Sequence, residues 1–339
     1  MKRKIVVKKI AHLAIVIPLT FSLSLLALFN TAFSENFSNS KIKVWGAKGN
    51  DQGKFNEPFA IAVDQSERVY VADARNHRIQ IFDQKGKFLG QWGKHGNGPG
   101  DFEKPSGIAV NNDGDIFVSD YDLDRIQKFT PQGNFLMQWG TPGKNPGQFD
   151  SPTGIAIDSH NYLYVTDTYN YRVQKFNLQG NFLHEWGEHQ PISTVSSFFN
   201  FLISPEAEGN FNYPTRIAAG PNSTIYVSDA YNNRVQAFSK DGKFLFQFGG
   251  SGFLGGSFRV SSGIAVDIKG HLYVADFYNN RIQMFTEEGS FLTEWGEEGE
   301  KIGQLKGPTD ITVDDQGGIY VVDWGNHRIQ VLHLNGGLD

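Results

Sequence analysis

The stretch DWGNHRIQ, residues 323–330, occurs five more times in the chain in nearly the same form. The other copies read DARNHRIQ, DYDLDRIQ, DTYNYRVQ, DAYNNRVQ and DFYNNRIQ, and they begin at Asp73, Asp120, Asp167, Asp229 and Asp276. Neighbouring copies start 47 residues apart, except that 62 residues separate the third from the fourth. A fixed period of this length indicates a repeat architecture. One unit therefore has 47 residues, and a single insertion of 15 interrupts the series.

Each unit contains four short strand patterns. In the first unit they cover residues 59–64, 68–73, 78–83 and 88–93, which are rich in β-branched and aromatic residues and bounded by Gly, Asn, Asp or Pro. The links between them have only three or four residues, so neighbouring strands must pair antiparallel. Six such units predict an all-β fold, a six-bladed β-propeller.

The last blade lacks a fourth strand within its own unit. Aromatic residues mark this strand in the first five units, at Trp92, Trp139, Trp186, Phe248 and Trp295. One period before the first of them lies Trp45, in the segment 41–46. We therefore expect the N-terminal strand to complete the last blade and to cover two strand edges. The propeller is expected within residues 35–339, with blades at 55–93, 102–140, 149–187, 211–249, 258–296, and 305–335 plus 41–46.

The first 34 residues differ from the repeats. A basic segment, residues 1–9, precedes an apolar run at 10–29, and the small residues Ala32 and Ser34 follow. This pattern predicts an export signal, and the alternative is an uncleaved membrane anchor. In both cases we expect the propeller outside the cytoplasm, in a periplasmic, extracellular or membrane-anchored location, with membrane contact only through this segment.

The Cys content and the net charge exclude some kinds of ligand and partner. The chain has no Cys, which excludes disulfides and thiolate metal sites. The first 34 residues hold five of the 31 basic residues and no acidic residue, so 26 basic and 36 acidic residues remain, a net charge of −10. Nucleic-acid binding draws on a basic face. We therefore expect no nucleic-acid partner.

A second motif precedes each Asp-containing turn. It reads PSGIAVN (105–111), PTGIAID (152–158) and SSGIAVD (261–267), with looser forms PFAIAVD (58–64), PTRIAAG (214–220) and PTDITVD (308–314). Over residues 41–335 the units resemble NHL repeats. The resemblance implies a six-bladed propeller of a family that serves as a recognition platform in extracytoplasmic sensor domains, ubiquitin-ligase subunits and RNA-binding regulators. A related propeller is a zinc-dependent amidating lyase, so the fold alone does not choose a function.

Residues that recur in the copies are expected to build the frame, because six-fold repetition belongs to a scaffold. The repeated Asp and Asn, such as Asp73 and Asn76, are expected to close turns by bonding nearby backbone N–H groups, with Asn tolerating positive φ. The repeated Arg, such as Arg78, is expected to pair with the Asp. The fourth-strand Trp residues are expected to pack between blades.

Positions that differ between copies are candidates for a ligand site. The turns share one face of the ring with the linkers between blades, and such loops carry binding residues. Aromatic residues stand there at Tyr169, Tyr231 and Tyr278, and charged residues at Arg75 and Asp122. Exposed aromatics suit stacking on sugars or capping of peptide side chains. The alternative is packing against the neighbouring blade.

Four further residues are candidates for the ligand site. Trp324 is the one Trp outside the fourth-strand position, and Arg216 and Asp310 replace the Gly or Ala of other blades where the first strand enters the central channel. His77 is expected to approach the last blade where the ring closes. We predict Trp324, Asp310 and His77 on one side of a ligand site, with Tyr231 and Arg216 across the channel. The alternative for the two charges is solvated surface.

Signals for catalysis are weak. The sequence has no phosphate-binding loop and no nucleophile elbow. The stretch 120–124 begins like a calcium loop, but Arg125 and Pro131 replace the required Gly and Glu. His77 and His327 lack an obvious third metal ligand. We therefore expect no catalytic residues and no cofactor, with zinc or calcium as the alternative.

The sequence favours an exported, non-enzymatic binding module that recognises a peptide, protein or glycan on its loop face. The alternative is a metal-assisted lyase or hydrolase that resembles the amidating branch. The insertion at 188–210 is rich in apolar residues, such as SSFFNFLIS at 196–204. It is expected to form a lid, a partner contact or a short helix folded on its own blade.

Overall fold

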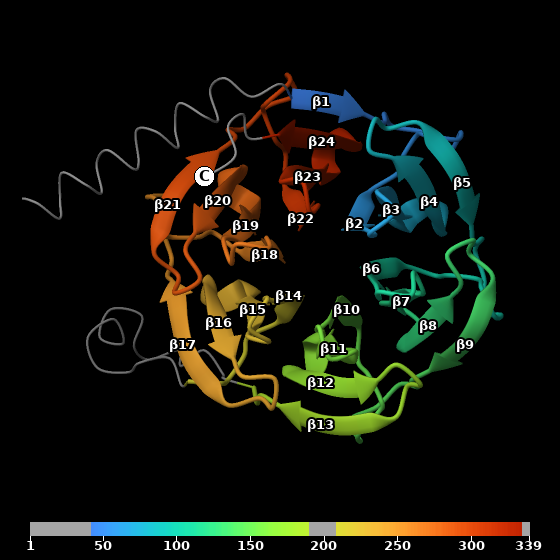
Figure 1. Ribbon diagram of the computed structural model, residues 1–339, viewed down its shortest axis with the longest axis horizontal. Helices are drawn as coiled ribbons and strands as arrows, with labels where there is room; N and C mark the ends of the chain where they lie inside the picture. The colour runs from blue at the N-terminus through green and yellow to red at the C-terminus, as the bar shows by residue number, and fades with distance from the viewer. Residues whose placement is uncertain (1–41, 190–207, 334–339) are drawn as a thin grey trace, which may run out of the picture.

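The computed structural model describes residues 42–189 and 208–333. In these ranges six four-stranded antiparallel sheets surround a central axis (Figure 1). The predicted six-bladed propeller is therefore confirmed. The predicted signal or anchor at 1–34 and most of the 188–210 insertion lie outside the described residues. In the described ranges, no helix has the length and apolar character that a membrane crossing requires.

The first strand of each blade lines the central channel. These strands are β2 (Pro58–Val63), β6 (Pro105–Val110), β10 (Pro152–Ile157), β14 (Pro214–Ala219), β18 (Ser261–Val266) and β22 (Pro308–Val313). A Cβ at Gly154 would lie 2.9 Å from the Cα of Arg216, and one at Gly263 would lie 2.6 Å from the Cα of Asp310. Glycine is therefore needed at Gly154 and Gly263, because the first strand of the next blade approaches closely there.

The second strands form the middle of each blade. They are β3 (Arg68–Asp73), β7 (Ile116–Asp120), β11 (Tyr162–Asp167), β15 (Ile225–Asp229), β19 (Leu272–Asp276) and β23 (Gly318–Asp323). Their side chains are almost all buried, because each face of a blade packs on its neighbour. Tyr164, for example, is fully buried and donates its hydroxyl to Asp158 Oδ2 at 2.9 Å. The core is thus divided into layers between consecutive blades.

The third strands follow the Asp-containing turns. They are β4 (Arg78–Asp83), β8 (Arg125–Phe129), β12 (Arg172–Asn177), β16 (Arg234–Phe238), β20 (Arg281–Phe285) and β24 (Arg328–His333). In five blades the turn is a 3-10 helix of three residues: η1 (Ala74–Asn76), η2 (Thr168–Asn170), η3 (Ala230–Asn232), η4 (Phe277–Asn279) and η5 (Trp324–Asn326). Each 3-10 helix ends at a residue with φ of 53–56°, such as His77 or Tyr171.

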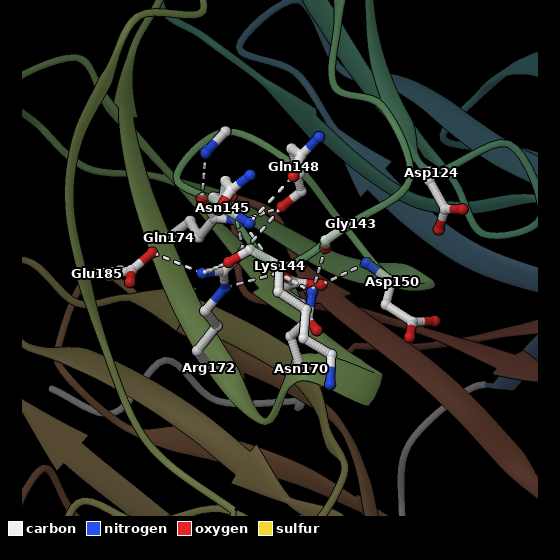
Figure 2. A network of polar contacts seen from close by, with 12 residues as sticks. Asp124, Gly143, Lys144, Asn145, Gln148, Asp150, Asn170, Arg172, Gln174 and Glu185 are labelled. Atoms are coloured by element: carbon white, nitrogen blue, oxygen red, sulfur yellow. Dashed lines mark hydrogen bonds and ion pairs between the residues drawn. The ribbon is translucent and has the colours of Figure 1, made fainter.

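A buried aspartate at the end of the second strand is the centre of a polar network, which Figure 2 shows in blade three around Arg172. Asp167 is fully buried. Its Oδ2 accepts hydrogen bonds from Asn170, Arg172 and Gln174 at 2.9, 2.8 and 3.0 Å. Its Oδ1 accepts the backbone N–H of Asp150 at 2.7 Å. The aspartate thus joins its own third strand to the segment that enters the blade.

The arginine of the motif extends this network to the connection between blades. Arg172 Nη1 donates to the carbonyl of Lys144 and to Glu185 Oε2, both at 2.8 Å. Its Nη2 donates to the carbonyls of Asn145 and Gln148 at 3.1 and 2.9 Å. With Nε on the aspartate, all five donors of the guanidinium are used. The predicted Asp–Arg pair is present in five blades, with N–O distances of 2.7–2.9 Å.

The roles expected for the repeated Asp and Asn need correction. The Asp does not cap its own turn, because its side chain accepts the N–H of a residue 17 positions earlier in the chain. The Asn is not the residue with positive φ, since that conformation belongs to the next residue, such as His77 or Tyr171. Instead the Asn donates to the carboxylate and to the preceding loop, as Asn170 does to Gly143 O at 2.8 Å. Both residues therefore hold the connection between blades.

Blade two departs from this arrangement, because Leu123 stands where the other blades have Asn. Both oxygens of Asp120 are used by backbone N–H groups, Oδ2 by Glu103 at 3.0 Å and Oδ1 by Lys104 at 2.9 Å. The Nε of Arg125 is buried and has no hydrogen-bond partner. The missing Asn thus lets the carboxylate turn away from its arginine.

This difference predicts opposite effects of two substitutions. Asn170→Leu should lower the free energy of unfolding by about 1–2 kcal/mol, because it removes donors from a buried carboxylate and from a carbonyl. Leu123→Asn should raise it, since it supplies the missing donor in blade two. Urea unfolding of both variants would measure the effects. Equal stability of Asn170→Leu and the parent chain would show that the Asn does not support the frame.

The fourth strands form the outer rim, and one of them closes the ring. They are β5 (Phe88–Trp92), β9 (Phe135–Trp139), β13 (Phe182–Trp186), β17 (Phe244–Gly249), β21 (Phe291–Trp295) and β1 (Ile42–Trp45). β1 pairs antiparallel with β24, with Trp45 opposite Ile329, at the edge of blade six in Figure 1. The ring of Trp45 lies 4.6 Å from that of Phe82 in blade one. A Cβ at Gly86 would lie 2.4 Å from the Trp45 ring, so the tryptophan packs directly on this turn.

Trp45→Ala should therefore loosen the closure. We expect a loss of about 3 kcal/mol, because an aromatic ring packed between two blades is replaced by a cavity. Thermal unfolding would measure it, with Lys43→Ala as the control, since Lys43 lies exposed on the same strand. An equal melting temperature for both variants would contradict a stabilising role of this closure.

Candidate functional site

An apolar cavity of about 230 Å³ opens on the face of the ring that carries the turns. Its floor consists of the second residue of several first strands, namely Phe59, Thr153, Thr215, Ser262 and Thr309. Its wall comes from the turns and linkers of blades four and five and from the channel, namely Tyr231, Val260, Phe277, Tyr278 and Arg216. We call this cavity the aromatic cup.

The floor of the aromatic cup follows from the strand geometry. Two hydroxyl residues at this position bond the next blade: Thr153 donates to Thr215 O, and Ser262 donates to Pro308 O, both at 2.7 Å. The hydroxyls of Thr215 and Thr309 are buried and have no hydrogen-bond partner. Buried polar groups without a partner are uncommon and call for an explanation. Here they belong to two residues in the floor of the aromatic cup.

The rim of the aromatic cup is built by rings on two turns. Tyr231 lies on η3 and Tyr278 on η4, and the two residues are 59% and 57% exposed. Phe277, half-buried, has its ring 4.9 Å from that of Tyr278 in an edge-to-face arrangement. Because the turns are held by the Asp and Arg of their blades, these rings stand on a rigid base. Such rings can cover an apolar group without much loss of side-chain entropy.

Arg216 reaches across the channel below the aromatic cup. Its Nη2 donates to the carbonyl of Phe59 at 2.6 Å, although the two residues belong to blades four and one. Its Nε lies 3.1 Å from Oδ1 of Asp310 in blade six, without the alignment of a hydrogen bond. The guanidinium carbon lies 4.9 Å from the centre of the Phe59 ring. Nη1 is buried and unpartnered, so both of its N–H groups are unused.

Asp310 is buried beside Arg216 and accepts the N–H of Ile61 at 3.1 Å. Burial raises the pKa of Asp310, and the nearby Arg216 opposes this shift. A second cavity, of about 190 Å³, runs along the first strands and is lined by both residues of the pair. Arg216 lines both cavities, so the ion pair lies where the aromatic cup meets the channel.

The buried ion pair predicts that the stability cost of replacing Arg216 depends on pH. Arg216→Met should cost about 3–5 kcal/mol at neutral pH, because it leaves a buried carboxylate without its cation. The pKa of Asp310 should then rise further, so the folded state should bind a proton that the unfolded state does not hold. The cost should therefore shrink as the pH falls toward the ordinary Asp range.

Urea unfolding at several pH values would measure this cost. The double variant Arg216→Met, Asp310→Asn should recover most of the stability at neutral pH. A cost independent of pH, or no recovery in the double variant, would show that the charge of Asp310 is not responsible.

The structure brings together some of the residues proposed from the sequence and separates others. Tyr231, Tyr278 and Arg216 line the aromatic cup. Asp310 pairs with Arg216 below it, so these two charges form a buried ion pair and are not solvated surface charges. Trp324 is half-buried, with its ring 6.1 Å from that of Phe277, outside the lining.

The remaining proposed residues lie elsewhere on the turns. Tyr169 is 44% exposed, with its ring 5.1 Å from that of Tyr213. Arg75 pairs with Glu57 at 3.0 Å, and Asp122 is exposed. His77 does not approach blade six as expected.

His77 instead bonds the carbonyl of Glu103, at the junction of blades one and two. At the closure the contact is made by His327, whose Nδ1 accepts the N–H of Glu57 at 3.1 Å. Our expectation for His77 was therefore wrong, because the residue that ends each 3-10 turn faces the following blade. Blade one thus meets blade two through His77, and blade six meets blade one through His327.

Phe59 and Phe277 were not singled out from the sequence, although a signal was present. The second residue of the first-strand motif is Ser or Thr in five units and Phe only in the first. That position forms the floor of the aromatic cup, and Phe59 is the signal, because it departs from the Ser or Thr of the other units. The candidate residues Arg216 and Asp310 were instead taken from the third position of this motif.

The family comparisons agree with this architecture. Residues 50–130 match a family described as "6-bladed beta-propeller". Four segments match the family described as "NHL repeat", namely 149–176, 211–238, 262–285 and 305–332. The protein is therefore a β-propeller of six blades. The chain carries NHL repeats in these four segments.

Among curated proteins, similarity is confined to short segments. The chain is 39% identical to protein lin-41 of Caenorhabditis elegans over 59 residues, which is 17% of this chain and 5% of that protein. It is 48% identical to protein brain tumor of Drosophila melanogaster over 44 residues, 13% of this chain and 4% of that protein. It is 47% identical to the E3 ubiquitin-protein ligase TRIM32 of Mus musculus over 45 residues, 13% and 7% of the two chains. The matches thus span less than a tenth of these relatives.

Solved structures share the fold over most of the chain. A virginiamycin B lyase from Staphylococcus aureus aligns with a TM-score of 0.56 and 16% identity, over 87% of this chain and 100% of the lyase. A gluconolactonase from Xanthomonas campestris aligns with a TM-score of 0.62 and 14% identity, over 89% of this chain and 92% of that protein. At such identities the likeness shows the fold alone.

Proposed function

We propose that the protein is a binding module that recognises a peptide segment of a partner protein in the aromatic cup. The observation that carries this proposal is the combination of an apolar cavity with rings at its rim and an unused arginine donor in its wall. An apolar side chain of the peptide would fill the cavity, covered by Tyr231 and Tyr278. Burying one large apolar side chain contributes about 1.5–3 kcal/mol.

Arg216 supplies the polar part of the recognition. Its Nη1 lacks a partner, and the hydroxyls of Thr215 and Thr309 lack one nearby. A peptide carbonyl or carboxylate would use such donors, and a donor buried without a partner carries an energetic penalty that ligand binding relieves. The NHL-repeat architecture supports a recognition role, since short segments of this chain resemble parts of much longer proteins such as an E3 ubiquitin-protein ligase.

A peptide fits the aromatic cup better than a glycan does. Sugar recognition requires several polar groups at the surface, whereas the lining here consists mostly of aromatic, aliphatic and methyl groups. The alternative of a lyase or hydrolase requires an acid, a base or a metal ligand beside the substrate. In the described lining of the cup, no residue is a carboxylate or an imidazole. Location outside the cytoplasm, expected from residues 1–34, remains part of this proposal.

Selection from a random peptide library, followed by affinity measurement, tests the proposal. The selected peptide should bind Tyr278→Ala about thirtyfold more weakly, because truncating a ring that anchors a ligand costs about 2 kcal/mol. Tyr169→Ala is the matched control, since Tyr169 is an exposed tyrosine at the same turn position of blade three, outside the lining. Unchanged affinity in Tyr278→Ala, or ligands found only on a glycan array, would refute it.

A further inference from the structure

Two histidines and a glutamate meet at the junction of blades one and two. His77 ends the turn after β3, His95 lies in the connection after β5, and Glu103 lies in the segment that enters β6. Each residue offers one possible ligand atom, and the three atoms lie within 4.8 Å of one another. Segments far apart along the chain thus bring three metal-binding groups to one place.

The ring of His77 is held in a defined orientation. Its Nδ1 lies 2.6 Å from the carbonyl oxygen of Glu103. Because a carbonyl only accepts, Nδ1 must carry the proton and donate it. The lone pair of the neutral ring is then on Nε2. Histidines that bind metals commonly donate their other N–H to a carbonyl or carboxylate in this way, which fixes the tautomer.

The other two residues already contact each other. His95 Nε2 lies 2.8 Å from Glu103 Oε2, and the rings of His95 and His77 are 4.7 Å apart. The side chain of His95 is 66% exposed, and that of Glu103 is 40% exposed. His95 can therefore adjust its rotamer to bring its nitrogen to bonding distance of an ion, while His77 stays fixed.

The frame of the propeller does not require these residues. In four other blades the residue equivalent to His77 accepts a backbone N–H of the next blade: Asp124 from Ser151 at 2.7 Å, Asn233 from Val260 at 2.7 Å, Asn280 from Gly307 at 2.8 Å and His327 from Glu57 at 3.1 Å. At the junction of blades one and two the equivalent N–H belongs to Lys104, and Asp120 accepts it. Because Asp120 accepts this N–H, His77 does not make the structural hydrogen bond that its equivalents make in four other blades.

Among the six junctions between blades in the described residues, this combination of two histidines and a glutamate occurs at one. The equivalent triplets at the other five junctions are Asp124, Pro142 and Asp150; Tyr171, His189 and Asn212; Asn233, Ser251 and Arg259; Asn280, Glu298 and Lys306; and His327, Lys48 and Asn56. In none of them do all three side chains belong to the usual metal ligands. The cluster is therefore a departure from the repeat and not a consequence of it.

We propose that His77, His95 and Glu103 bind a divalent transition-metal ion, with Zn²⁺ as the ion that their chemistry suits best. Two imidazole nitrogens and one carboxylate form a zinc ligand set that leaves a fourth position for water or a ligand group. The ion would replace the direct His95–Glu103 contact and link blade one to blade two.

The site would lie on the same face as the aromatic cup. Lys104, next to Glu103, has its Nζ 5.8 Å from the centre of the Phe59 ring, which forms part of the cup floor. An ion held by Glu103 would therefore add positive charge beside the cup. The proposal does not depend on peptide binding, because the three ligands lie outside the cup lining.

Calorimetric titration with Zn²⁺ tests this site, using the full chain without a polyhistidine tag after treatment with a chelator. We expect one tight equivalent per chain and a higher melting temperature with Zn²⁺. His95→Asn should weaken binding at least about tenfold, the loss that even a supporting residue of a metal site causes. Because His95 is exposed, this variant should fold like the parent chain without metal.

His189→Asn is the matched control. His189 occupies the position of His95 at the junction of blades three and four, where its ring lies 4.0 Å from that of Tyr171 and no carboxylate completes the set. It should bind Zn²⁺ like the parent chain. Glu103→Gln should weaken binding as His95→Asn does. Absence of a tight equivalent, or equal affinity in His95→Asn and the parent chain, would overturn the proposal.

Discussion

The propeller depends on a carboxylate that is buried at the end of each second strand. In five of the six blades this group accepts donors from its own blade and from the segment that enters it, and the adjacent arginine binds the carbonyls of the connection to the previous blade, as in blade three. Burying a charge costs free energy unless the charge is paired and hydrogen-bonded. The hydrogen bonds of the buried aspartate and arginine therefore fix each connection between blades. This makes the loop face rigid.

A rigid frame leaves other turn positions free to differ. The aromatic residues at the rim of the cup stand between residues that the frame fixes: Tyr231 precedes Asn232, and Tyr278 precedes Asn279. Neither ring is required to hold its blade, since blade one has Arg75 at the same position. Repeat proteins commonly separate frame and function in this way. The cup and the metal-binding cluster both occupy positions where the six units disagree.

The fold was predictable in detail because its signals are local and repeated. Each strand pattern was present several times, and the phase of Trp45 sufficed to predict the closure by β1. The site was harder to predict from the sequence, because its residues come from different blades and the distances between them depend on the diameter and tilt of the ring. Tyr231, Tyr278 and Arg216 were found as symmetry breaks, whereas His77 was placed at the wrong junction. The sequence does not show that the residue ending each turn faces the following blade. It also does not show that Asp120 accepts the N–H of Lys104, so that His77 bonds the carbonyl of Glu103 instead.

The pairing of β1 with β24 has a consequence for how the chain folds. Ile42 pairs with Leu332, so the first described strand cannot find its partner until the last has been synthesised. The five other blades are each made of consecutive strands and have short-range contacts. Contacts between segments this far apart in sequence slow folding. Ring closure should therefore be the final, rate-determining event, and until it occurs the chain presents two open strand edges to the protein-folding machinery of the cell.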